Sequence, residues 1–279
     1  MLKKIEKLYS FLNQSRHVNA NGLKIYIGKL SDGCLRCMAG EWACLYINLN
    51  CTQRCFYCPI AEDRRKPLKS INLMIDDKIF ESVDICVGYL KRFDFSGIAF
   101  SGGEPLLEYD RLIRIIQMIR DELGLECYIW LYTNGDSVTE AKLSELAAVG
   151  LKEIRFNLTE KNYFSEKLEL AVAKIPTVTV EIPAIPEDVH RVSMVLEDYT
   201  RIGVNYINLN QLSLNRNNEK ELAVRGYSII NGSWVIDSEL AALKIMRSVV
   251  DRELPINISF CSQAYKKYIT DFSLKRRFS

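Results

Sequence analysis

The chain has 279 residues, of which 48% are hydrophobic and 26% are charged, and its formal net charge is +2. Such a composition is typical of a globular protein with a sizeable core. It gives no strong electrostatic attraction to nucleic acid, although it does not exclude nucleic acid as a partner. No run of apolar residues approaches the ~18 residues of a membrane-spanning helix, so we expect no membrane partner.

Residues 1–41 are predicted to form an N-terminal extension. Lysines alternate with leucine and isoleucine at helical spacing over residues 2–12, which predicts an amphipathic helix and argues against a signal peptide. The chain has nine cysteines. Without a secretion signal they indicate the reducing cytoplasm and metal ligation rather than disulfides.

The first two cysteines stand close together in this extension. A short alternating segment, residues 23–30, leads to a turn at Asp32-Gly33, and Cys34 and Cys37 follow in a C-x2-C pattern. A C-x2-C pattern on a glycine-flanked turn is a common half of a metal site. A pair of free thiols is the alternative.

A second group of cysteines follows the apolar run of residues 42–49. Cys51, Cys55 and Cys58 form a C-x3-C-x2-C pattern. Three thiolates on one short loop can hold three irons of a [4Fe–4S] cluster and leave the fourth iron open to a small molecule. A zinc site usually needs four ligands, and a disulfide would leave one cysteine over. Three structural cysteines at this spacing would be a coincidence, so we favour the cluster.

From residue 42 the sequence alternates between apolar runs and amphipathic segments. The pattern predicts strands and intervening helices. The strands are expected at residues 43–49, 97–101, 127–133, 153–158, 177–183 and 205–211, and the helices at residues 76–92, 108–122, 138–149, 162–174 and 188–202. This alternation predicts an α/β fold, a parallel sheet rolled into a partial (β/α)6 TIM-type barrel over residues 42–212, with short N-terminal and C-terminal extensions.

Polar residues stand where the predicted strands end. In parallel barrels the loops after the strands carry the working residues. The first strand ends in the cysteine loop, and the second ends in Ser101-Gly102-Gly103-Glu104. Turn chemistry could account for any single polar residue at the later strand ends, but together they predict a pocket for hydroxyl, amine and carboxylate groups. These residues are Thr133, Asn134, Arg155, Asn157, Thr159, Glu181, Asn208, Asn210 and Gln211.

The two motifs together resemble those of the radical S-adenosylmethionine (SAM) enzymes. Tyr57 fills the aromatic position before the third cysteine, and Gly102-Gly103-Glu104-Pro105 matches the segment that follows the family's next strand. The resemblance covers roughly residues 42–212. It implies that the cluster is held by Cys51, Cys55 and Cys58, and that the open iron binds the amino and carboxylate groups of SAM.

The same resemblance implies a set of contacts to SAM. Gly102, Gly103 and Glu104 would meet the methionine amine, Tyr57 would lie near the adenine, and Asn157 would reach the ribose. Residues 181–188 depart from the family's glycine-rich motif on the fifth strand, so no adenine contact is implied by that motif. The remaining SAM contacts would be Thr133, Asn134, Glu181 and Gln211.

In the implied reaction the cluster and SAM carry out the chemistry, and the protein positions and shields them. An electron from the reduced cluster cleaves SAM to methionine and a 5′-deoxyadenosyl radical, which abstracts a hydrogen atom from the substrate. A donor such as ferredoxin or flavodoxin is the implied electron source. The substrate is a small molecule or a peptide or protein side chain. Glycyl-radical activation is included, because several segments also resemble a branch related to pyruvate formate-lyase activating enzymes.

A second function remains open at this point. The chain could be an iron–sulfur electron-transfer or binding protein that keeps the fold without cleaving SAM. The Gly102-Gly103-Glu104 segment favours the enzyme, because an electron carrier needs no site for an amine. No catalytic side chain of the protein itself is assigned.

Residues 213–279 are predicted to form a C-terminal extension. A hairpin-like insertion at residues 225–239 would precede a helix at residues 240–251 and a basic tail. The tail and the basic segment Arg64-Arg65-Lys66 are expected to form a solvated surface or to bind an anionic partner.

Cys261, near the end of the chain, is the best candidate to join Cys34 and Cys37. The three would hold a metal ion or a second iron–sulfur cluster. Cys44 could be a fourth ligand, although it lies within an apolar run and could be a core residue.

Overall fold

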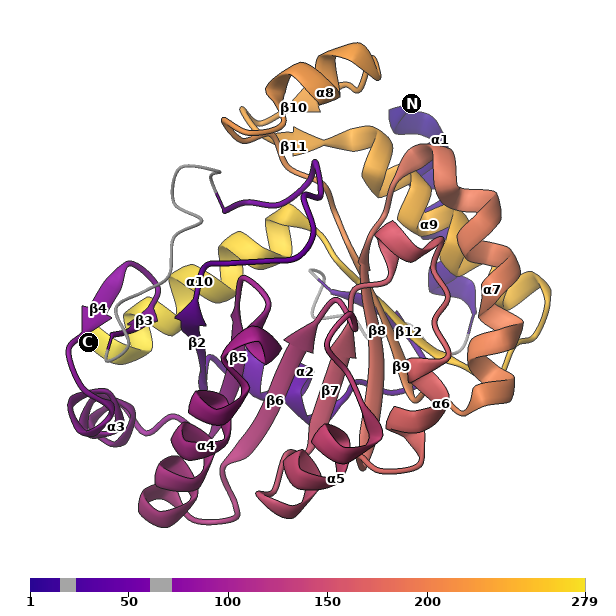
Figure 1. Cartoon of the computed structure of the whole chain (residues 1–279). Helices are drawn as coiled ribbons and strands as arrows, with labels where there is room; N and C mark the ends of the chain where they lie inside the picture. The colour runs from indigo at the N-terminus through magenta and orange to yellow at the C-terminus, as the bar shows by residue number, and fades with distance from the viewer. Residues whose placement is uncertain (16–23, 61–71, 279) are drawn as a thin grey trace.

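The computed structural model describes residues 1–15, 24–60 and 72–278. Within these residues the centre is a curved ten-stranded sheet of order β1-β12-β9-β8-β7-β6-β5-β2-β3-β4 (Figure 1). From β12 to β2 in this order, every adjacent pair of strands is parallel. These strands are β12 (Asn257–Cys261), β9 (Tyr206–Asn210), β8 (Thr177–Pro183), β7 (Glu153–Phe156), β6 (Tyr128–Thr133), β5 (Gly97–Gly102) and β2 (Trp42–Asn48).

Short antiparallel strands extend both edges of the parallel part. On one side β1 (Ile25–Ile27) pairs with β12. On the other side the hairpin of β3 (Leu73–Ile75) and β4 (Lys78–Phe80) pairs with β2. The parallel strands therefore form a partial barrel. Strand β1 extends the sheet at one edge, and the β3–β4 hairpin extends it at the other.

Helices cover the outside of the sheet and also lie against its concave face. The crossover helices α3 to α7 and the helix α9 pack on the outside, and α1 packs on α9 (Figure 1). The short helix α2 lies on the other face, against β5 and β6, and α10 follows β12 directly. The helices are α1 (Leu2–Gln14), α2 (Asp32–Met38), α3 (Val83–Arg92), α4 (Tyr109–Leu123), α5 (Glu140–Ala148), α6 (Lys167–Val172), α7 (Val189–Ile202), α8 (Glu219–Val224), α9 (Ile236–Asp251) and α10 (Gln263–Phe278).

The strands alternate between an apolar outer face and a polar inner face, as successive side chains of a strand must point to opposite sides. On β7, Ile154 and Phe156 belong to the main hydrophobic core under the helices. Glu153 and Arg155 point to the concave face, where helix α2 is seated on them. A Cβ atom at Gly33 of α2 would lie 2.5 Å from the Arg155 guanidinium, so this contact requires glycine.

The six predicted barrel strands are confirmed, each with boundaries within two residues of those expected. The predicted helix at residues 76–92 is partly wrong, because residues 78–80 form β4. Asp76 has φ of 53° in the turn that precedes β4. Helix α3 starts only at Val83, where the Ser82 side chain accepts a hydrogen bond from the Ile85 N–H and caps the helix.

Two further elements differ from expectation. The predicted turn at Asp32-Gly33 is the first turn of α2, because the Ser31 hydroxyl accepts the Cys34 N–H and acts as the N-cap. The basic tail is a helix, α10, of 16 residues. The basic segment at residues 64–66 lies outside the described residues.

The insertion predicted at residues 225–239 contains the hairpin of β10 (Ile229–Ile230) and β11 (Trp234–Val235), and α8 precedes it. Helix α9 begins at Ile236, four residues before the predicted start. We refer to α8, β10 and β11 together as the insertion. It packs over the cysteine loop through a small hydrophobic cluster. Phe56 of that loop also lies under the Arg225 guanidinium, 4.5 Å from ring centroid to charge. The insertion therefore covers the loop that carries the three cysteines.

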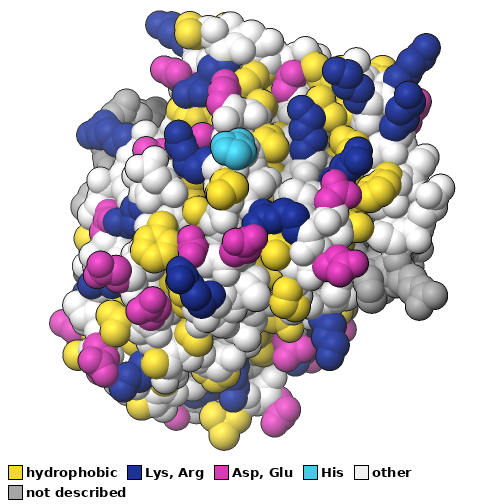
Figure 2. Space-filling model, turned by 90° about the vertical axis from the view of Figure 1, so that its right-hand side faces the viewer, with side chains coloured by type: hydrophobic (Ala, Val, Ile, Leu, Met, Phe, Trp, Pro, Cys, Tyr) yellow, Lys and Arg dark blue, Asp and Glu magenta, His cyan; other side chains and the backbone are white. Residues whose placement is uncertain are grey.

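On the face of the molecule that Figure 2 shows, lysine and arginine side chains are interspersed with aspartate and glutamate. No large area of one charge is visible there, in keeping with the small net charge of the chain. In the part of the chain that the structure describes, no helix is long and apolar enough to cross a membrane.

Candidate active site

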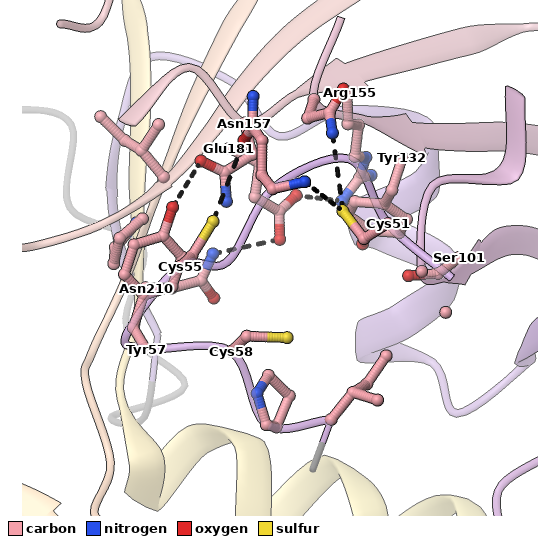
Figure 3. Close-up of a pocket in the computed structure, with 18 of the residues that line it drawn as sticks. Cys51, Cys55, Tyr57, Cys58, Ser101, Tyr132, Arg155, Asn157, Glu181 and Asn210 are labelled. Carbon is pink, nitrogen blue, oxygen red and sulfur yellow. Dashed lines mark hydrogen bonds and ion pairs between the residues drawn. The ribbon is translucent and has the colours of Figure 1, made fainter. Parts of the chain in front are cut away.

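A cavity of about 440 Å³ opens at the carboxyl ends of the parallel strands. The loops after β2, β5, β6, β7, β8 and β9 contribute to its wall, and so does the first turn of α10. Figure 3 shows strand-end side chains and the cysteine loop facing one another across this space. The structure brings together here all the residues expected at the cluster and SAM: Cys51, Cys55, Tyr57, Cys58, Gly102, Gly103, Glu104, Thr133, Asn134, Asn157, Glu181 and Gln211.

The cysteine loop is held by the neighbouring strand ends. Tyr57 donates its hydroxyl hydrogen to Asn157 Oδ1 at 3.1 Å, which ties the loop to the end of β7. Thr52 donates to the carboxylate of Asp136, which also pairs with Lys161. These contacts fix both ends of the loop, so the three thiols are positioned before any ligand arrives.

The donor set fits an iron–sulfur cluster. The Gln53 N–H and the Asn134 side-chain amide point at the Cys51 sulfur, at 3.4 and 3.6 Å. Such N–H groups stabilise a thiolate ligand and tune a cluster. Burial raises the pKa of the Cys51 thiol, and it raises the pKa of the Cys55 thiol to about 12. Both thiols would therefore ionise only on binding to positively charged metal ions, such as the irons of a cluster.

The three cysteines line the same cavity. In the described residues no group of three or more His, Cys, Asp or Glu side chains is placed to hold a single metal ion. In a [4Fe–4S] cluster each cysteine binds a different iron, so the three sulfurs need not converge on one point.

The glycine pair interlocks with the cysteine loop. Gly102 has φ of +105°, which favours glycine, and a Cβ there would lie 2.4 Å from the Asn48 carbonyl oxygen. A Cβ at Gly103 would lie only 1.8 Å from the carbonyl oxygen of Asn50. The Gly103 N–H donates to the Asn48 carbonyl at 3.0 Å. The two sequence motifs therefore pack on each other with no room for a side chain.

The Glu104 carboxylate accepts three hydrogen bonds from the protein. Glu104 is 1% exposed, and the donors are the Thr133 hydroxyl at 2.9 Å, the Asn134 N–H at 2.7 Å and the Leu106 N–H at 3.1 Å. Burial raises the pKa of Glu104, although these hydrogen bonds act in the opposite direction. The carboxylate thus ties the end of β5 to the end of β6.

A charged network includes Arg155 and Glu181 of the cavity wall. Arg155 pairs with Glu153 at 2.8 Å and with Glu181 at 2.9 Å. Asn208 and Asn210 also donate to the Glu181 carboxylate, at 3.1 and 3.2 Å. Burial alone would raise the pKa of Glu181, but the Arg155 charge and the two amides outweigh it and hold that pKa below its usual value.

The cysteines of the two extensions share one buried region below this network. The Lys24 ammonium donates to the Cys261 sulfur at 3.0 Å, and the Asn208 amide donates to the Cys34 sulfur at 3.4 Å. Burial raises the pKa of Cys37, and the charges of Lys24, Cys34 and Cys261 all act on it. The metal ion or second cluster expected at Cys34, Cys37 and Cys261 stays a prediction.

Cys44 lies in different surroundings. It packs with Trp42 and Tyr132 against the aromatic group around Trp130. Burial raises the pKa of its thiol to about 12, and the nearby groups that act on it include Ser101 and Tyr46 rather than the other three cysteines. These contacts are those of a core residue.

Sequence reasoning missed part of the cavity wall. Lys266 and Gln263 line it from α10, and Tyr132 and Ser213 also reach it. Gln263 is fixed by two hydrogen bonds to Gln211, at 2.7 and 2.8 Å. The strand-end rule would have found the α10 residues if β12 had been placed in the barrel.

Comparison with known proteins gives three likenesses. Residues 45–163 match the model of the radical SAM superfamily. A protein of Methanocaldococcus jannaschii, which carries the provisional name of a glycyl-radical enzyme activating enzyme, is 29% identical over 253 residues. That match covers 86% of this chain and 65% of the relative, so the chain spans about two thirds of the relative's length.

The third likeness is structural. The fold is similar to that of SuiB from Streptococcus suis, with a TM-score of 0.54 and 14% identity over 79% of this chain and 49% of that chain. For SuiB bound to S-adenosylmethionine the TM-score is also 0.54, at 12% identity over 79% of this chain and 50% of that chain. At these identities the likeness extends to the fold alone.

Proposed function

Since the chain is a member of the radical SAM superfamily, whose cofactors are a [4Fe–4S] cluster and SAM, we propose that it cleaves SAM reductively and removes a hydrogen atom from a substrate. Cys51, Cys55 and Cys58 would hold the cluster. When bound and reduced, the cluster supplies the electron that splits SAM into methionine and a 5′-deoxyadenosyl radical. A small electron-transfer protein such as ferredoxin or flavodoxin would supply that electron.

The residues of the chain would orient SAM and exclude water. The backbone N–H groups of Gly103 and Glu104 are used by the carbonyls of Asn48 and Asn50. Gly102 and Gly103 line the cavity beside the cysteines, and their carbonyl oxygens would receive the ammonium of SAM. Glu104 would position these carbonyls and the Asn134 amide rather than bind SAM through its own oxygens.

The single observation that carries this proposal is the interlocking of the two motifs at one cavity. The cysteine loop and the Gly102-Gly103-Glu104 segment touch through backbone groups, and both face the same space as the polar ends of β6 to β9. An electron carrier needs only a cluster near the surface. A cavity of about 440 Å³ lined by amides and charged groups favours an enzyme over the electron-transfer alternative.

One substrate class has specific support. The M. jannaschii relative is named for activating a glycyl-radical enzyme. By analogy, the hydrogen atom would come from the Cα of a glycine in a partner polypeptide.

The test is product formation under anaerobic conditions. Reconstituted protein with SAM and dithionite should release 5′-deoxyadenosine, and a variant with Cys51, Cys55 and Cys58 all replaced by Ala should release none. A Cys86→Ala variant is a suitable control, because Cys86 is a buried core residue of α3 that does not line the cavity. Wild-type protein that carries its cluster and yet forms no 5′-deoxyadenosine would contradict the proposal.

A further inference from the structure

Lys266 places a positive charge in the cavity wall. It stands in the first turn of α10, and its backbone N–H donates to the Ser262 carbonyl at 2.9 Å. The start of this helix is also fixed by the hydrogen bonds between Gln263 and Gln211. Lys266 is therefore carried on a rigid part of the fold.

The ammonium of Lys266 lacks an anionic partner. In the part of the chain that the structure describes, it makes no ion pair and no side-chain hydrogen bond. Burial lowers the pKa of Lys266, although the nearby thiol of Cys261 and carboxylate of Glu181 act to raise it. Lys266 is half-buried, and its side chain lines the open cavity, where a bound anion can reach it.

The other charges at the cavity are already satisfied. Glu104 accepts three hydrogen bonds from the protein. Arg155 is engaged by both Glu153 and Glu181, and Glu181 accepts two further amides. Among the described residues of the wall, Lys266 is thus the charged side chain that makes no ion pair with another side chain, and a bound anion could supply one.

Lys266 lines the same cavity as the proposed methionine site. Lys266 follows β12, whose Cys261 is in register with Asn210 of β9, and it shares the cavity wall with Gly102 and Gly103. In the proposed function the open iron of the cluster binds the amino and carboxylate groups of SAM. The counter-charge for Lys266 would then come from a second molecule.

We propose that Lys266 binds a carboxylate group of the substrate that gives up the hydrogen atom. A carboxylate fits better than a phosphate dianion, because the neighbouring guanidinium of Arg155 is neutralised by two carboxylates. Lys266 therefore offers a single positive charge beside an acidic residue. This inference rests on the proposed function for the identity of the bound molecule, but the anion site can be tested without turnover.

Acetate is the smallest suitable probe, and acetamide is its uncharged counterpart. We would measure acetate binding to anaerobic, reconstituted, SAM-loaded protein by saturation-transfer NMR, without reductant and at constant ionic strength. The Lys266→Met variant keeps the length of the side chain and removes its charge, and it should lose at least tenfold in acetate affinity. Its affinity for SAM should change less than threefold. Lys266→Arg should retain acetate binding, which shows that the site is intact when a cation is present.

The matched control is Lys267→Met. Lys267 is exposed and pairs with Asp271 along the same helix, so its removal should leave acetate binding as in the wild type. Equal acetate binding in wild type and Lys266→Met, or none in wild type, would overturn the proposal. So would acetate that binds only without SAM, because Lys266 would then serve the carboxylate of SAM. Failure to form 5′-deoxyadenosine would count against the proposed function and not against this site.

Discussion

Glu104 offers the sharpest test of how the two motifs work together. In Glu104→Gln one carboxylate oxygen becomes an NH2 group. If that group replaces Oε2, it faces the Asn134 N–H, now 2.7 Å from the oxygen, and two donors oppose each other. If it replaces Oε1, two bonds are lost instead, those from Thr133 and Leu106.

The magnitude follows from these contacts. A buried hydrogen bond to a charged group contributes about 1.5–3 kcal/mol. Even the less damaging of the two amide orientations loses one such hydrogen bond. We therefore expect Glu104→Gln to lower the free energy of unfolding by about 1.5–3 kcal/mol. SAM affinity should fall with it, because the Asn134 amide and the glycine carbonyls lose their position. Thr133→Val removes a single donor and should have a smaller effect on both.

The assay has two parts. Urea unfolding of the cluster-free protein gives the change in stability, and calorimetry on reconstituted protein gives the change in SAM affinity. Unchanged stability with a tenfold loss of SAM affinity would refute the reasoning, because it would mean that the carboxylate binds the methionine amine directly. No change in either quantity would show that the network does not support the site.

Three more predictions use other parts of the site. Gly103→Ala should reduce the iron and sulfide taken up on reconstitution, because its Cβ would collide with the Asn50 carbonyl, whereas Gly88→Ala in helix α3 has open space and should leave iron uptake unchanged. The pKa of Glu181 is lower in the folded protein than the value of about 4.3 in the unfolded chain. Glu181 therefore stabilises the fold at pH values above about 4.3, and this stabilisation is lost as the pH falls through the folded pKa. Acid titration of unfolding should therefore show a weaker loss of stability below pH ~4 in Glu181→Gln than in wild type, and an equal loss would contradict this account. Arg225→Ala should speed the loss of cluster absorbance in air, since the Arg225 guanidinium covers Phe56 of the cysteine loop, and an unchanged rate would show that this contact does not shield it.

Local sequence patterns predicted much of the barrel. The apolar runs marked the six strands, and the strand-end rule brought the cysteines, Glu104, Asn157 and Glu181 to one place before any contact was known. This worked because strand direction and side-chain alternation are set by local geometry.

The rest depends on contacts between distant parts of the chain. The pairing of β12 with β9 joins segments about fifty residues apart, and no local periodicity encodes such a neighbour. Lys266 was read as part of a basic tail for that reason. The contact between α2 and Arg155 likewise requires glycine at position 33, because a Cβ atom there would collide with the guanidinium. In the sequence, Gly33 had indicated a turn.

The central claim is that Cys51, Cys55 and Cys58 hold a [4Fe–4S] cluster whose open iron binds SAM. The most direct measurement is the electron paramagnetic resonance spectrum of the dithionite-reduced, reconstituted protein before and after SAM is added. We predict a cluster signal in the wild type whose g values shift with SAM, and no SAM-sensitive signal when the three cysteines are replaced by Ala. A wild-type signal that SAM leaves unchanged, or the same SAM-sensitive signal in the triple variant, would contradict the account.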